Sequence, residues 1–89
     1  MAKYILWGRY CENALEKRKP YRQAHLDGLA QQKDSGMLVT LGPTADNTQV
    51  FGIYDAENEA SVRQLIENDP YWKNGIWTEY EVKAWIQAF

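Results

Sequence analysis

A histidine and an aspartate are the two residues of this chain that we consider for proton transfer. His25 is its single histidine, and imidazole exchanges a proton most readily near neutral pH. A carboxylate hydrogen-bonded to one imidazole nitrogen fixes the tautomer, so the other nitrogen can take or give a proton. Asp69, which precedes Pro70, is the carboxylate that we expect beside His25. Whether the two meet depends on the elements that carry them.

Strand and helix patterns alternate along the chain. β-Branched, aromatic and alternating residues predict four strands, over residues 3–10, 37–42, 49–55 and 76–88. Helical patterns predict two helices, over residues 21–34 and 56–68. Ser35-Gly36 supplies the stop of the first helix, Asp55 can cap the second, and Asp69-Pro70 ends it. Residues 11–19 fit either a loop or a short helical lead-in.

The order β-α-β-β-α-β predicts an α+β fold of the ferredoxin-like type, a four-stranded antiparallel sheet with two helices on one face. The length predicts a single domain over residues 1–89. In this topology one edge of the sheet collects the residues expected to form a site: Tyr10, Arg22, His25, Gly42, Pro43, Asp69, Tyr71 and Trp72. Asp34 and Asp55 fall at the opposite edge. His25 and Asp69 are therefore predicted neighbours.

Charge and aromatic character at this edge favour a small ligand. Arg22 lies one helical turn before His25 and would hold an anionic group. Aromatic walls suit a small anionic, aromatic or enol-containing molecule. Gly28 is unfavourable in a helix interior, so we expect another element or a ligand to approach it closely.

Structural roles explain the same residues. A helical histidine is often part of a core, and Asp69 before proline ends a helix and turns the chain. Arg22 can pair with a carboxylate, and Gly42-Pro43 can be a turn. The tryptophans suit a core or an interface. The sequence has no spacing typical of a metal site and no glycine-rich phosphate loop.

Side-chain alternation predicts a second contact surface. Helices cover one sheet face, so the other face would expose an apolar patch that a second copy could cover. In the first strand, Ile5 and Trp7 lie opposite Tyr4, Leu6 and Tyr10. In the second strand, Met37, Val39 and Leu41 lie opposite Leu38 and Thr40. In the last strand, Trp77 lies on the face of Glu79, opposite Tyr80 and Val82. We expect a homodimer through the open sheet face.

Composition argues against several other classes of partner. The net charge is −2 with interleaved signs, so no basic stripe for nucleic acid is present. Cys11 is the single cysteine, which favours a reducing, cytoplasmic location. The apolar run at the start is too short for a signal peptide or a membrane span. We expect no membrane partner and no cofactor.

Three ordered motifs carry a family resemblance. They are Tyr21-Arg22-Gln23-Ala24-His25-Leu26, then Gly36 to Pro43 (GMLVTLGP), then Asp69-Pro70 with Gly75-Ile76-Trp77. This set resembles the YCII-related (YciI-like) family. The resemblance implies a dimeric ferredoxin-like fold (a dimeric α+β barrel) akin to muconolactone isomerase, with an active site on a His–Asp pair. The pair carries over to His25 and Asp69, with Asp34 a weaker match because topology sends it to the far edge.

One branch of that family removes chloride from chlorinated hydroxyhydroquinones, but the substrate does not transfer. Our leading hypothesis is a small lyase, isomerase or dehydrochlorinase-like enzyme acting on an enol, phenolic or carboxylate substrate. His25 would move a proton, Asp69 would orient it, and Arg22 would hold the anion. The alternative is a non-catalytic ligand-binding or dimerisation module with a vestigial pocket.

Overall fold

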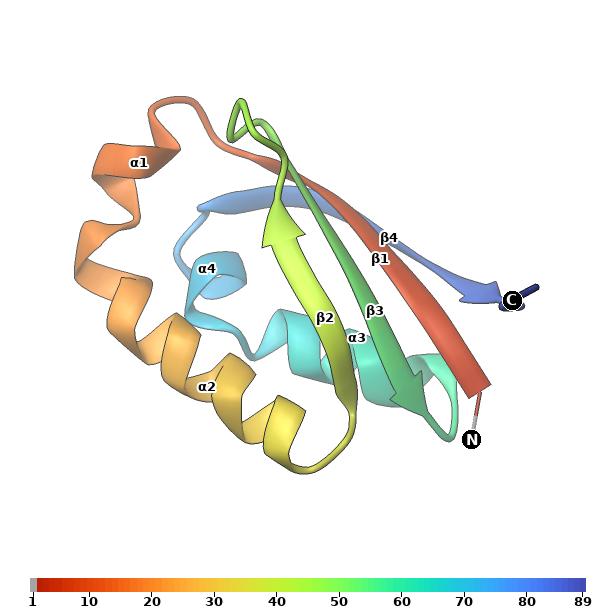
Figure 1. Ribbon diagram of the computed structural model, residues 1–89. Coiled ribbons are helices and arrows are strands. Elements are labelled where there is room, and N and C mark those ends of the chain that lie inside the picture. The colour runs from red at the N-terminus through yellow and green to blue at the C-terminus, as the bar shows by residue number, and fades with distance from the viewer. Residues whose placement is uncertain (1) are drawn as a thin grey trace.

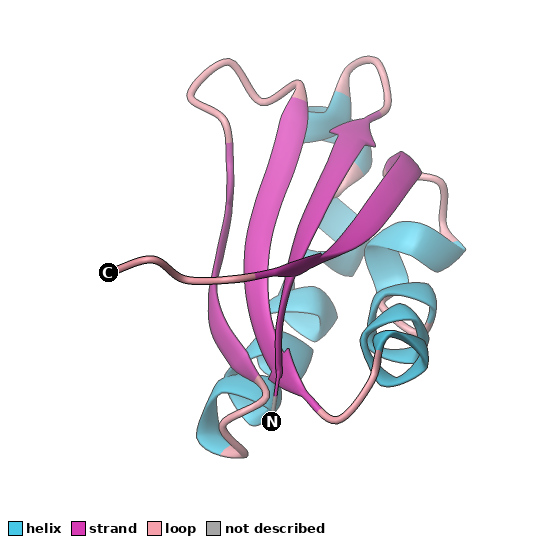
Figure 2. Cartoon of the chain, turned by 90° about the vertical axis from the view of Figure 1, so that its right-hand side faces the viewer, coloured by secondary structure: helices cyan, strands magenta, loops and turns pink. Residues whose placement is uncertain are grey.

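A twisted antiparallel sheet forms one layer of the protein and helices form the other (Figures 1 and 2). The computed structural model describes residues 2–89. Its strands are β1 (Ala2–Tyr10), β2 (Leu38–Pro43), β3 (Gln49–Ala56) and β4 (Trp77–Trp85). They lie in the order β2-β3-β1-β4, and each neighbouring pair is antiparallel. The predicted ferredoxin-like α+β fold is confirmed.

Within residues 2–89, two long helices and three short ones lie on one side of the sheet. They are α1 (Ala14–Lys17), the 3-10 helix η1 (Lys19–Tyr21), α2 (Arg22–Asp34), α3 (Glu59–Glu67) and α4 (Pro70–Lys73). Residues 11–19 are thus mostly the helical lead-in. The short helix α4 was not predicted, because four residues are too few to show a period.

The predicted cap of the second long helix was wrong. Asn58 caps α3, and its side chain accepts a hydrogen bond from the Ser61 backbone N–H at 2.9 Å. Asp55 stays in β3 because it pairs with Lys3 across the sheet, where their charged groups lie 3.6 Å apart. The helix therefore begins three residues later than the predicted start at residue 56.

The core lies between the sheet and the helices. Its largest fully buried side chains are Trp77, Tyr54, Tyr71, Leu6, Ile66, Ile76, Val50 and Val62. The opposite sheet face carries Trp7 and Phe51, which are about two-fifths exposed and pack edge to face at 6.0 Å. The alternation predicted for the first strand is confirmed.

Two β-bulges overturn the alternation predicted for the other strands. Between β1 and β4, Arg9 pairs with Glu79 but Tyr10 pairs with Trp77. The extra residue, Thr78, turns Trp77 to the helix face, where its exposed fraction is 1%. A second bulge between Leu38 and Thr40 returns Leu41 to the core side, away from the face of Val39. A period of two cannot reveal such an insertion.

Strand β4 ends at Trp85, before the predicted residue 88, and the four residues after it are exposed. Within residues 2–89, no helix combines the length and the apolar character that crossing a membrane requires.

The expected close approach of another element to Gly28 was also wrong. A Cβ atom built at Gly28 meets no atom within 4 Å outside its own helix. We therefore predict that Gly28→Ala stabilises the protein by about 0.4–1 kcal/mol, because alanine restricts the unfolded chain and favours the helix. Urea unfolding measures the change.

Gly8→Ala is the matched comparison. Its Cβ would lie 2.9 Å from the Glu79 carbonyl oxygen and 2.9 Å from Val50. We expect it to destabilise by about 1–3 kcal/mol, since the sheet backbone cannot yield cheaply. Equal effects of the two substitutions would contradict this packing.

Candidate active site

His25 and Asp69 form a buried hydrogen-bonded pair at the helix side of the sheet. The Nδ1 atom of His25 lies 2.8 Å and 2.9 Å from the two carboxylate oxygens of Asp69. The exposed fractions of the residues are 4% and 5%. The predicted contact across 44 sequence positions is confirmed. It joins the first turn of α2 to the start of α4.

Local backbone structure holds the aspartate in place. Asp69 is extended because it precedes Pro70, and it caps α4 by accepting the Tyr71 backbone N–H at 2.8 Å. The same carboxylate thus organises a helix start and binds the imidazole. Since an ionised carboxylate only accepts hydrogen bonds, we assign the proton in this contact to Nδ1 of His25. Nε2 is then the nitrogen available to a ligand.

Two aromatic rings enclose the imidazole. Tyr71 stacks on His25 with 3.6 Å between centroids and 7° between planes. Trp77 stands perpendicular to the imidazole, at 5.3 Å and 88°. Tyr10 packs edge to face on Tyr71 at 6.5 Å. Burial raises the pKa of the Tyr10 and Tyr71 hydroxyls, so both remain neutral donors near neutral pH.

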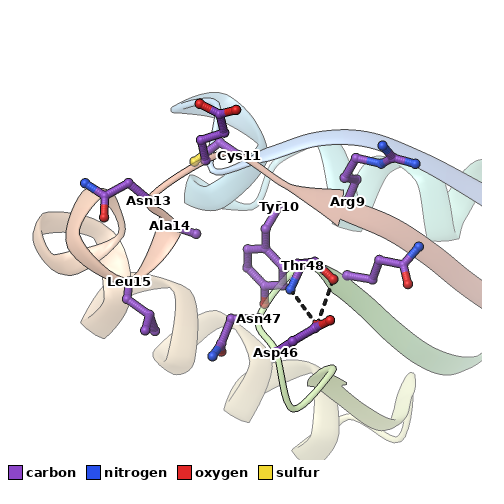
Figure 3. A pocket seen from close by; sticks show the side chains of 11 residues that line it. Arg9, Tyr10, Cys11, Asn13, Ala14, Leu15, Asp46, Asn47 and Thr48 are labelled. Carbon is purple, nitrogen blue, oxygen red and sulfur yellow. Dashed lines mark hydrogen bonds between the residues drawn. The ribbon is translucent and has the colours of Figure 1, made fainter.

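A cavity of about 620 Å³ opens at the same edge of the sheet (Figure 3). It lies between the segment after β1 and the β2–β3 loop, and Arg9, Tyr10, Cys11, Glu12, Asn13, Ala14, Leu15, Asp46, Asn47, Thr48 and Gln49 line it. Tyr10 and Ala14 are its buried lining residues. His25 and Asp69 are not among the lining residues, so Tyr10 separates the cavity from the rings around His25.

The rim of this cavity carries a carboxylate fixed in place. The hydroxyls of Thr44 and Thr48 each donate to Asp46 at 2.7 Å. These hydrogen bonds hold the pKa of Asp46 below its usual range, so it stays ionised. Arg9, on the other side, lies 3.9 Å from Glu79. The mouth therefore presents both signs of charge.

The other predicted site residues occupy different positions. Arg22 is exposed at the start of α2. Gly42 and Pro43 end β2 and pair with Phe51 and Val50. Trp72 packs edge to face on Tyr80 at 5.0 Å. These four do not line the cavity, and their ligand contacts stay predictions.

Asp34 is excluded as the partner of His25. It ends α2 and is exposed. It lies nine positions after His25 in the helix, about 13.5 Å along the axis. The far-edge placement expected from topology is therefore confirmed.

Two residues near the pair were missed. Trp77 reaches His25 only because of the bulge in β4. Arg18 caps the end of α1, and its positive charge acts to lower the pKa of both Tyr10 and Tyr71 against the effect of burial. Its position depends on the α1–η1 turn, for which the sequence left a loop and a helix open. In the described part of the chain, no three His, Cys, Asp or Glu side chains gather as metal ligands.

We predict that Asp69→Ala destabilises the protein by about 2–4 kcal/mol. The change removes the cap of α4 and leaves the buried His25 N–H unpaired. Asp27→Ala on the exposed side of α2, where only Gln23 is bonded to the carboxylate, should change stability by less than about 0.5 kcal/mol. Urea unfolding of both variants measures the difference, and similar values would contradict a structural role for the pair.

Comparison with known proteins finds relatives that match this chain over almost their whole length. Two curated proteins, Protein YciI of Escherichia coli and an uncharacterized protein of Haemophilus influenzae, are each 28% identical over 97% of this chain and 98% of theirs.

Two solved structures share the architecture. 5-Chloro-2-hydroxyhydroquinone dehydrochlorinase (TftG) from Burkholderia phenoliruptrix, solved with 2,5-dihydroxybenzoquinone, is 26% identical over 97% of this chain and 95% of its own, with a TM-score of 0.83. A NIPSNAP domain protein from Burkholderia xenovorans is 17% identical over 99% of this chain and 95% of its own, with a TM-score of 0.57, and shares the fold alone. The model of the YCII-related domain matches residues 2–86. The chain therefore belongs to the YCII-related family.

Proposed function

We propose that this protein is a small lyase-type enzyme that moves a proton on a phenolic or enol substrate. His25 is the acid and base, and Asp69 orients it. The hydrogen bond from His25 Nδ1 to Asp69 supports this proposal most directly, because it leaves Nε2 for the substrate. The similarity to the dehydrochlorinase supports the substrate class.

A chlorinated hydroxyhydroquinone illustrates what the pair would do. A proton moves from a ring hydroxyl to the carbon that bears chlorine. Chloride then leaves with the electrons of the carbon–chlorine bond while a second hydroxyl loses its proton. The products are a hydroxyquinone, chloride and one proton. Each transfer needs one site that both takes and gives a proton, and a neutral imidazole is such a site.

Further residues are proposed to hold the substrate. Tyr10 lines the cavity and, kept neutral by its raised pKa, can donate to a substrate oxygen. Arg22 lies one turn before His25 and supplies a positive charge for an anionic group.

A second candidate function is a ligand-binding module without chemistry. The burial of His25 and its absence from the cavity lining favour this reading. Turnover separates the two candidates, because a module binds a probe without changing it.

We predict that the protein releases chloride from 5-chloro-2-hydroxyhydroquinone and that His25→Ala lowers kcat/KM by about a hundredfold or more. Asp34→Asn, at the far end of α2, is the control and should keep the activity. Chloride release and quinone absorbance are the measurements. Full turnover by His25→Ala would contradict the assignment, and binding without turnover by the unchanged protein would favour the module.

We also propose that two copies pair through the open sheet face. Ile5, Trp7, Phe51 and Ile53 form an apolar patch there, and a small domain gains stability by covering such a surface. A partner of the same sequence matches the patch by two-fold symmetry.

Trp7→Glu should therefore convert a dimer to a monomer, because it places a charge in the centre of this patch. Gln31→Glu, on the exposed surface of α2, is the matched charge control. Light scattering at micromolar concentration gives the masses. A monomeric unchanged protein, or a dimeric Trp7→Glu variant, would show that this face is not the interface.

A further inference from the structure

A buried hydrogen-bond donor next to His25 lacks an acceptor. The exposed fraction of Trp77 is 1%, and its indole Nε1 has no hydrogen-bond partner among residues 2–89. Buried polar groups are nearly always bonded, so an unpaired one at a site calls for an explanation. The indole N–H can only donate. Whatever completes it must bring an acceptor.

The two stacked rings beside Trp77, those of His25 and Tyr71, do not supply that acceptor. His25 and Tyr71 are stacked with their centroids 3.6 Å apart, yet both lie at similar distances from Trp77, 5.3 Å and 5.7 Å. If Trp77 lay above one face of the stack, its distance to the farther ring would be much greater than its distance to the nearer ring. Trp77 therefore stands beside the stack, and neither ring offers its π-face to the indole N–H.

Tyr10 lies between this donor and the cavity. The bulge pairs Tyr10 with Trp77 across β1 and β4, and Tyr10 is a buried lining residue of the cavity. The Tyr10 hydroxyl oxygen is the nearest candidate acceptor, because the indole N–H acts to lower the pKa of Tyr10 against the effect of burial. The contact falls short of hydrogen-bond geometry, so the donor stays unsatisfied. Tyr10 is therefore the side chain that would have to turn for a ligand in the cavity to reach Trp77.

We propose that the indole N–H of Trp77 binds an oxygen of the ligand beside His25, reached from the cavity when Tyr10 turns aside. This inference rests on the proposed function and adds a residue that selects ligands carrying a phenolate or enolate oxygen. Such an oxygen satisfies the donor, and an atom held there lies within a small ligand's length of the imidazole, whose centroid is 5.3 Å from that of the indole.

The charges around the donor suit an oxygen with partial or full negative charge. The positive charge of Arg18 acts to lower the pKa of both Tyr10 and Tyr71, and that of Arg22 acts to lower the pKa of Tyr71. The negative charge of Asp69 has the opposite effect on these pKa values. Its carboxylate already accepts hydrogen bonds from His25 and from the Tyr71 backbone N–H. The two tyrosines beside Trp77 are therefore under the influence of two positive charges and of one carboxylate that is already hydrogen-bonded.

Trp77→Phe tests the donor, because it removes the N–H and keeps an aromatic ring. The probes are 4-nitrophenol, at a pH where it is ionised, and nitrobenzene, which lacks the phenol oxygen. We expect Trp77→Phe to weaken binding of 4-nitrophenol about tenfold, the loss of one hydrogen bond to a charged group, and to leave nitrobenzene binding unchanged. Thermal unfolding checks that the variant is folded.

A second readout uses the unchanged protein. Its four tryptophans give four indole N–H resonances in a proton–nitrogen spectrum, and Trp7→Phe, Trp72→Phe and Trp85→Phe identify that of Trp77 by elimination. We expect 4-nitrophenol to move the Trp77 resonance downfield and to leave that of Trp7, on the open sheet face, in place.

The outcomes separate this inference from the proposed function. If 4-nitrophenol binds and neither Trp77→Phe nor the Trp77 resonance responds, the donor role is wrong while the His25 chemistry stands. If neither probe binds, the donor role is overturned together with the phenolic substrate class.

Discussion

The hydrogen bond between His25 Nδ1 and the Asp69 carboxylate connects the parts of the molecule that carry the proposed chemistry. It spans 44 positions and ties the start of α2 to the junction of α3 and α4. Because the same carboxylate caps α4, it also sets the backbone that carries Tyr71, the ring stacked on His25. One side chain thus fixes the tautomer of the imidazole and the position of its aromatic neighbour.

A β-bulge in the sheet brings a further residue, Trp77, to this site. A regular ladder would turn Trp77 to the open face, beside Glu79. The bulge opposite Arg9 and Tyr10 turns it inward, where it borders the imidazole and leaves its N–H unpaired. Bulges concentrate where a strand must re-aim a side chain. Tyr10 thus lies between the cavity and the buried cluster of Trp77, Tyr71 and His25.

Topology and periodicity predicted the fold and the central contact because both depend on long segments. The order of elements was sufficient to place His25 and Asp69 at one edge and Asp34 at the other. Single-residue events were missed. Trp77 and Leu41 depend on inserted residues in β4 and β2, and Asp55 pairs with Lys3 in the sheet instead of capping α3. Gly28 was expected to lie against another element, but no atom outside its helix lies within 4 Å of a Cβ built there.

The central claim is that Asp69 holds the proton of His25 on Nδ1 and leaves Nε2 to the ligand. Since His25 is the single histidine, a long-range proton–nitrogen NMR spectrum reports its ring without ambiguity. At a pH where the ring is neutral, the account predicts a protonated Nδ1 and an unprotonated Nε2, and Asp69→Ala should release that preference. A ring protonated on Nε2, or one whose tautomer does not depend on Asp69, would contradict it.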